Sequence, residues 1–157
     1  AKGGRYKEAM DLISKYWGAM LDLGATSFWE DLTYSDVANA GRIDEIVPAD
    51  RYDIHSGGGA YCYTGLRLSM CHGWASGPTS WMTRHVLGVT PLEPGCRTIE
   101  VAPNLGSLNS VEGTFPTPFG PVKISASRNA KGAVDCKVDA PKGVKVVKKA
   151  GSTLAMK

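Results

Sequence analysis

Two stretches of this 157-residue sequence, Gly24–Asp31 and Ser69–Thr79, carry side chains that could do chemistry together. A carboxylate and an imidazole can bind and move protons, and an indole ring offers a flat apolar face. Segments that only fill a core rarely combine these groups, so the pattern predicts a sugar-handling pocket. The side chains in question are Trp29, Glu30, His72 and Trp74.

A structural interpretation of the same residues stays open beside this one. Tryptophan is highly buried on average, so Trp29 and Trp74 could be core residues. Glu30 and His72 could then be solvated groups or helix caps.

Length and composition bound the class of protein. A chain of 157 residues is one domain or two small ones, and it could bury about 70% of its extended-chain surface. A formal charge of +3 is too small and too dispersed to predict a nucleic-acid partner. The sequence contains no run of about 18 apolar residues, so we expect no membrane span. It begins at Ala1 and enters a helical pattern almost at once, which suggests a piece of a longer polypeptide.

The four cysteines show no metal-binding pattern. They form no CxxC pair and have no zinc-site spacing with histidine. Cys136 alternates with charged neighbours, as a buried strand residue would. We expect all four, Cys62, Cys71, Cys96 and Cys136, to be free thiols.

The first half of the chain is predicted to be helical at both ends and irregular between them. Residues 5–23 repeat apolar side chains every three or four positions, which predicts a helix that Gly24 ends in a left-handed cap. Residues 32–59 form an acidic insertion without periodicity, and residues 60–76 fit either a strand or a short helix followed by an irregular stretch. A second helix is expected from Pro78 to Gly88.

The second half has the periodicity of strands. Thr90–Gly95 holds two prolines and a glycine, which cannot continue a helix. After it, short alternating segments predict a small antiparallel β-sandwich, including a hairpin that turns at residues 129–132. The predicted strands cover residues 98–102, 111–115, 120–128, 134–138 and 144–147.

Several motifs in this order resemble the C-terminal part of bacterial α-L-rhamnosidases of glycoside hydrolase family 78. They are Gly24-Ala25-Thr26-Ser27-Phe28-Trp29-Glu30, Cys71-His72-Gly73-Trp74-Ala75-Ser76-Gly77-Pro78-Thr79, Leu87-Gly88-Val89, Pro94-Gly95 and Thr117-Pro118-Phe119-Gly120. The resemblance covers nearly the whole chain. It implies that residues 1–90 are the last helices of an (α/α)6 barrel and that residues 91–157 are a β-sandwich domain.

The resemblance also implies roles for the site residues. The family hydrolyses terminal α-L-rhamnosyl residues with inversion, and its general base falls on Glu30. Its sugar-contacting histidine falls on His72, and Trp29 and Trp74 become candidate walls for the sugar. An inverting enzyme needs a second carboxyl group about 6.5–9.5 Å away as its acid. No residue here matches the acid's motif, so we expect the acid upstream and this chain to be inactive alone.

The expected partners follow from that assignment. They are a rhamnose-containing carbohydrate and the upstream part of the same polypeptide, with no metal or other cofactor implied. The parent protein is expected to be periplasmic or extracellular.

Two other functions stay open. One is another (α/α)6 enzyme, such as an uronyl hydrolase or a polysaccharide lyase. Asp31 and the long insertion depart from the family's simplest pattern, and Asp44, Glu45 or Asp53 could reach the pocket and select another sugar. The second is a non-catalytic sugar-binding module.

Overall fold

The computed structural model describes residues 3–55 and 70–149. These residues divide into two compact units, one made of Ala1–Lys7 with Thr79–Lys157 and the other of Glu8–Pro78. The division into domains at residue 90 stays a prediction. The longer elements are α1 (Tyr6–Asp22), α2 (Gly77–His85), β1 (Val89–Pro91), β2 (Thr98–Val101), β3 (Ser110–Thr117), β4 (Gly120–Arg128), β5 (Val134–Asp139) and β6 (Lys145–Lys148). Short 3-10 helices are η1 (Tyr34–Asn39), η3 (Gly73–Ser76) and η4 (Pro94–Cys96).

Helix α1 follows the predicted apolar stripe. Met20 is buried and the other stripe residues are half-buried, whereas the positions between them are exposed except for the small residues Gly18 and Ala19. The helix ends where Gly24 takes a φ of +87°, as predicted for its cap. Residues 60–69, whose strand or helix nature was open, lie outside the described residues. The stretch after them becomes an irregular segment and then η3.

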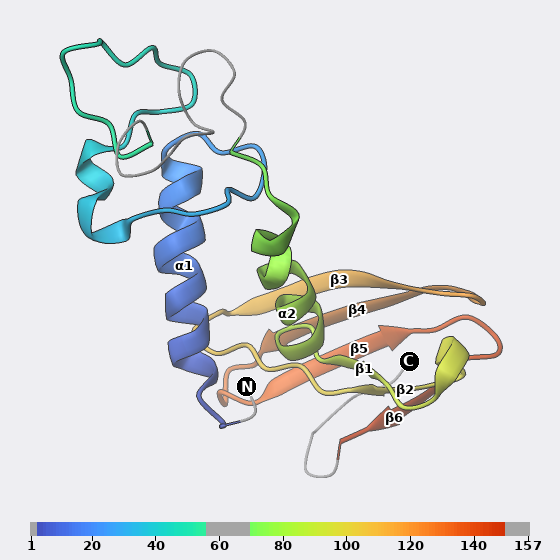
Figure 1. Ribbon diagram of the computed structural model, residues 1–157. Helices are drawn as coiled ribbons and strands as arrows, with labels where there is room; N and C mark the ends of the chain where they lie inside the picture. Colours follow the sequence, from blue (N-terminus) through green and yellow to red (C-terminus); the bar gives the residue numbers. More distant parts are fainter. Residues whose placement is uncertain (1–2, 56–69, 150–157) are drawn as a thin grey trace. The chain divides into compact units, whose positions relative to one another are not determined.

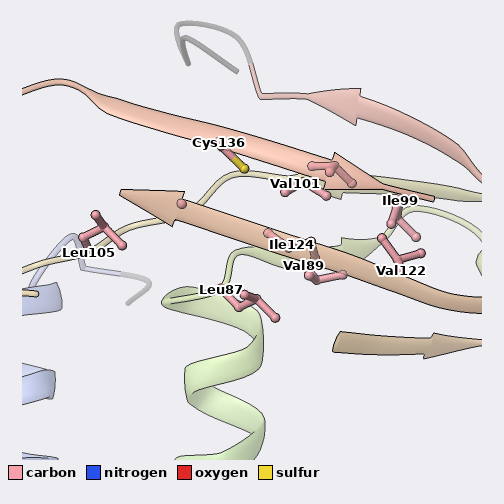
Figure 2. Packing of buried hydrophobic residues seen from close by; sticks show 10 residues of the cluster. Leu87, Val89, Ile99, Val101, Leu105, Val122, Ile124 and Cys136 are labelled. Carbon is pink, nitrogen blue, oxygen red and sulfur yellow. The ribbon is translucent and has the colours of Figure 1, made fainter. Parts of the chain in front are cut away.

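The strands form two three-stranded sheets, in the orders β1-β2-β6 and β3-β4-β5 (Figure 1). This arrangement is consistent with a β-sandwich. In β4, Val122, Ile124 and Ala126 are buried and the residues between them are exposed, as the period of two predicts. The core of the unit that holds the sheets lies among residues of the strands and their connections, beginning just after α2, and includes Leu87, Val89, Ile99, Val101, Leu105 and Val122 (Figure 2).

Two details of the sheets differ from the prediction. Strand β1 is an additional short strand, and it holds Pro91 at a sheet edge, where a missing N–H is tolerated. Strand β6 pairs with β2 in parallel, so the sheets are not purely antiparallel. The chain leaves β5 through the turn at Pro141–Gly143 and joins the other sheet, so no hairpin fixes the direction of β6.

The cysteines that the structure describes are free thiols, as expected. Cys136 is 2% exposed within the sandwich core, and burial raises the pKa of its thiol to about 11. Cys62 lies outside the described residues.

Gly88 and Gly95 offer a matched test of the turn after α2. Both have left-handed backbone, with φ of +80° and +77°. A Cβ on Gly88 would lie 2.2 Å from the carbonyl carbon and oxygen of Ala102, whereas a Cβ on Gly95 would meet nothing within 4 Å. The close approach at Gly88 brings the end of α2 beside the chain that leaves β2.

We therefore predict that Gly88→Ala destabilises the chain more than Gly95→Ala. The Gly95 change costs about 1–2 kcal/mol for the backbone conformation alone. The Gly88 change adds roughly 1–3 kcal/mol because the main chain must shift. Urea unfolding measures both variants, and equal losses would contradict the contact with Ala102.

Candidate active site

The structure brings the two predicted site stretches together through their main chains. Trp29 and Cys71 form an isolated antiparallel bridge. The Glu30 N–H donates to the carbonyl of Met70 at 2.8 Å, and the His72 N–H donates to the carbonyl of Phe28 at 2.9 Å. The paired residues are 40 to 44 positions apart in the sequence, and Glu30 and His72 belong to the two neighbouring segments that this isolated bridge joins.

The end of α1 sets the position of the first stretch. The Gly24 N–H donates to the carbonyl of Leu21 and the Ala25 N–H to that of Met20, both at 2.9 Å. This is the Schellman pattern, which satisfies main-chain carbonyls that would otherwise be left at a helix end. The chain therefore leaves α1 in one fixed direction, toward Trp29 and Glu30.

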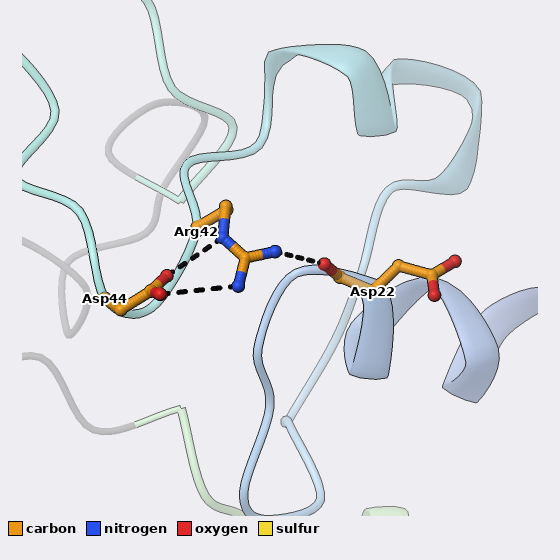
Figure 3. Close-up of polar contacts among 3 residues, drawn as sticks. All are labelled: Asp22, Arg42 and Asp44. Atoms are coloured by element: carbon orange, nitrogen blue, oxygen red, sulfur yellow. Dashed lines mark hydrogen bonds and ion pairs between the residues drawn. The ribbon is translucent and has the colours of Figure 1, made fainter.

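A residue of the acidic insertion, Arg42, contacts the same helix end (Figure 3). Arg42 donates to the carbonyl of Asp22 at 2.5 Å, and its Nε lies 2.9 Å from Oδ1 of Asp44. The hydrogen bond from Arg42 lowers the pKa of the Asp44 carboxyl, and the same bond raises the pKa of the Arg42 guanidinium. A cation at the carbonyl end of α1 also complements the helix dipole. Asp44 is thus paired with an arginine of its own loop.

His72 is a helix cap as well as a predicted sugar contact. It precedes η3, and its Nδ1 accepts a hydrogen bond from the main-chain N–H of Trp74 at 3.3 Å. Because an accepting Nδ1 carries no proton, the ring proton lies on Nε2, which is then a donor. The imidazole stacks on the Trp74 ring with centroids 4.1 Å apart and planes at 30°.

The two tryptophans of the site lie in different environments. Trp74 is 71% exposed, and its Nε1 donates to the carbonyl of Glu30 at 3.3 Å. Trp29 is 1% exposed and packs in a core with Met20, Leu32 and Met70. Contact between Trp29 and a sugar stays a prediction. What the structure shows is that Trp29, the neighbour of Glu30 in the sequence, is held in place by core packing.

His55, which no motif pointed to, also belongs to this core. It is 4% exposed, and its ring meets that of Trp29 edge-on with centroids 5.3 Å apart. Among the described residues, neither Trp29 Nε1 nor His55 Nε2 has a hydrogen-bond partner. Its sequence signal is weak and consists of Asp53 two positions earlier, a spacing typical of an Asx turn. In the structure, Asp53 Oδ1 accepts a hydrogen bond from the His55 N–H at 3.1 Å.

Asp53 links two parts of the insertion through its side chain. Its Oδ1 also accepts from the Gly41 N–H at 3.2 Å, and the side chain is largely buried. Asp53 therefore supports the loop, which leaves its proposed selection of another sugar untested. Within residues 3–55 and 70–149, no group of three His, Cys, Asp or Glu side chains could hold a metal ion. In the same ranges, no helix has both the length and the apolar character needed to cross a membrane.

The part of the chain that follows the segments of Glu30, His72 and Trp74 is rich in strands, and this part matches a known family. Residues 88–147 match the family described as the bacterial α-L-rhamnosidase C-terminal domain. The chain is also similar to the solved structure of a family 78 rhamnosidase of Bacillus sp. GL1. The identity is 26%, the TM-score is 0.69, and the match covers 99% of this chain and 14% of the other. No curated protein matches.

Both comparisons support the prediction that the chain resembles the C-terminal portion of a bacterial α-L-rhamnosidase. The resemblance seen in the sequence is therefore confirmed. This chain spans only a small part of the length of the solved relative.

The two indoles provide a prediction about stability. Trp29→Ala should lower the free energy of unfolding by about 3–5 kcal/mol, because it opens a cavity in the core. Trp74→Ala removes an exposed ring and one hydrogen bond, so the cost should be roughly 1 kcal/mol or less. Urea unfolding of both variants measures the difference. A loss for Trp74→Ala as large as that for Trp29→Ala would contradict the burial described above.

The buried imidazole provides a second prediction. Burial lowers the pKa of His55, although the charges of Asp53 and Asp31 oppose the shift. The unfolded chain therefore takes up a proton at higher pH than the folded chain does. The contribution of a neutral His55 is present above about pH 6.5 and is lost as the pH falls below it.

Between pH 7.5 and 5.5, the unaltered chain should thus lose more stability than His55→Asn. Urea unfolding at both pH values measures the two slopes. Equal slopes would show that the imidazole is not buried in its neutral form.

Proposed function

We propose that this chain is the C-terminal part of an inverting exo-glycosidase that removes terminal α-L-rhamnosyl residues from glycans or glycosides. The observation that carries the proposal is the pairing of residues 28–30 with residues 70–72, because it joins the segments that hold Glu30 and His72. The Trp74 indole, which donates to the Glu30 carbonyl, adds to it. The match to a rhamnosidase C-terminal domain supports the class of substrate.

Glu30 is the general base in this proposal. It removes a proton from a water molecule that attacks the anomeric carbon from the face opposite the leaving group. The general acid, which protonates the leaving oxygen, comes from upstream sequence. Glu30 follows the capped end of α1 in the sequence. Its N–H donates to the Met70 carbonyl and its own carbonyl accepts from Trp74 Nε1, so its main chain is held on both sides.

His72 and Trp74 bind the sugar in this proposal. With Nδ1 occupied by the Trp74 N–H, His72 presents Nε2–H as the donor to a sugar hydroxyl. The exposed Trp74 ring supplies an apolar face for the C–H groups and methyl group of a deoxy sugar. Trp29 contributes by packing in the core, which anchors the main chain next to Glu30.

The upstream partner is supported by α1. Its apolar stripe is mostly only half-buried, and Leu12 and Leu21 are 52% and 69% exposed. Helices of the same polypeptide would cover that surface if residues 1–90 complete an (α/α)6 barrel. We also propose a periplasmic or extracellular location for the parent protein, where plant glycans and glycosides are met.

The test uses the longest polypeptide encoded by the reading frame that contains these 157 residues, assayed on a panel of aryl glycosides. We expect hydrolysis of the α-L-rhamnoside with β-L-rhamnose as the first product, seen by NMR. Glu30→Gln should lower kcat by about 10²–10⁴-fold, as for removal of a general base. Asp31→Asn, an exposed neighbouring carboxylate, is the matched control and should leave kcat near that of the unaltered enzyme.

The 157-residue chain alone should show no turnover, because the acid is missing. Rhamnoside hydrolysis by this chain would contradict the claim that the general acid lies in upstream sequence. Full activity of Glu30→Gln would contradict its role, and cleavage of uronides instead of rhamnosides would favour the alternative barrel enzyme.

A further inference from the structure

The unit made of Ala1–Lys7 and Thr79–Lys157 contains a hollow that none of the predicted site residues line. Its volume is about 540 Å³. That size falls within the roughly 300–1,000 Å³ typical of small-molecule sites. The hollow lies where the end of α2 meets the start of β1, the end of β2 and the end of β4.

Positive charge dominates the lining of the hollow. Arg84, Arg128 and Lys149 contribute three cations, and Glu100 contributes one carboxylate. A concave surface with this imbalance concentrates the field of its charges and favours an anion. Arginine can meet a planar carboxylate with two parallel hydrogen bonds.

Two of the polar groups are held in place before any ligand arrives. Arg128 donates through Nε to the carbonyl of Leu108 at 3.2 Å and through Nη2 to that of Gly106 at 2.5 Å. These bonds use only part of the donor fork of a guanidinium. Asn104 accepts from the Gly106 N–H through Oδ1 at 3.1 Å, which orients its amide NH₂ as a donor.

One wall of the hollow is aromatic. The ring of His85 lies 6.0 Å from that of Tyr6 and 5.3 Å from that of Trp81, centroid to centroid. Burial and the charge of Arg84 lower the pKa of His85. His85 is half-buried, and together with Tyr6, which also lines the hollow, it can offer a flat ring face to the C–H side of a sugar.

We propose that this hollow binds an acidic sugar, a hexuronate, with its carboxylate on Arg84 and Arg128. Asn104 and Thr90 contact the sugar hydroxyls, and His85 covers one face of the ring. The sugar part of this proposal rests on the proposed function, whereas the anion part rests on the hollow alone.

Titration of the 157-residue chain at low ionic strength, followed by NMR, tests the proposal with three probes. Sodium galacturonate should bind with shifts at His85 and Asn104. Galactose, which has the same ring without the carboxylate, should bind about tenfold more weakly or worse. Inorganic phosphate should also bind more weakly than galacturonate, because it offers nothing to the ring face.

Three variants sharpen the result. Arg84→Gln should weaken galacturonate binding about tenfold or more. Glu100→Gln should strengthen it severalfold, because it removes a like charge, and a misfolded variant could not give that result. Arg97→Gln is the matched control, since Arg97 lies over Phe119 in the same unit and does not line the hollow.

Equal binding of galacturonate and galactose, phosphate binding as tight as galacturonate, or no effect of Arg84→Gln would each overturn the proposal. None of these results depends on Glu30 or on glycosidase turnover. A failure of the proposed function is therefore distinguishable from a failure of this site.

Discussion

A pair of main-chain hydrogen bonds, from Glu30 to Met70 and from His72 to Phe28, holds the candidate site together. Glu30, His72 and Trp74 all lie on or next to this pairing. Trp29 lies buried behind the pairing, and Trp74 lies exposed and bonds back to the Glu30 carbonyl. The residues that carry the carboxylate, the imidazole and the exposed indole are therefore joined by main-chain bonds, although Glu30 and His72 are 42 positions apart in the sequence.

Three sets of contacts hold the segments around that pairing in place. The Gly24 cap directs the chain out of α1, and Arg42 ties the insertion to the same helix end. Asp53 then fastens the insertion to itself and sets His55 against Trp29. Each of these contacts satisfies main-chain groups that irregular backbone would otherwise leave without partners, so the described part of the insertion is ordered with only the short helix η1.

Much of this structure was predictable from the sequence where the signal is local. The period of two gave β4 and β5 with their turn, and Gly24 marked the end of α1 through its need for positive φ. The parallel direction of β6 was not predictable, because it depends on the route between sheets. The irregular insertion was predicted, but its internal structure was not. The 3-10 helix η1 has no side-chain cap, and the position of His55 depends on a bond from its main-chain N–H to Asp53, which leaves no periodic signal in the sequence. For the site, the motifs indicated the residue types, but only the fold separated the buried Trp29 from the exposed Trp74.

The most direct test of the pairing is the nuclear Overhauser effect between the Hα protons of Trp29 and Cys71 in the 157-residue chain. The two residues face each other as an antiparallel pair without mutual hydrogen bonds. In such a pair the Cα atoms lie about 4.5 Å apart, so the account predicts a strong cross-peak. Its absence, in spectra where both protons are assigned and α1 is intact, would contradict the placement of Glu30 beside His72.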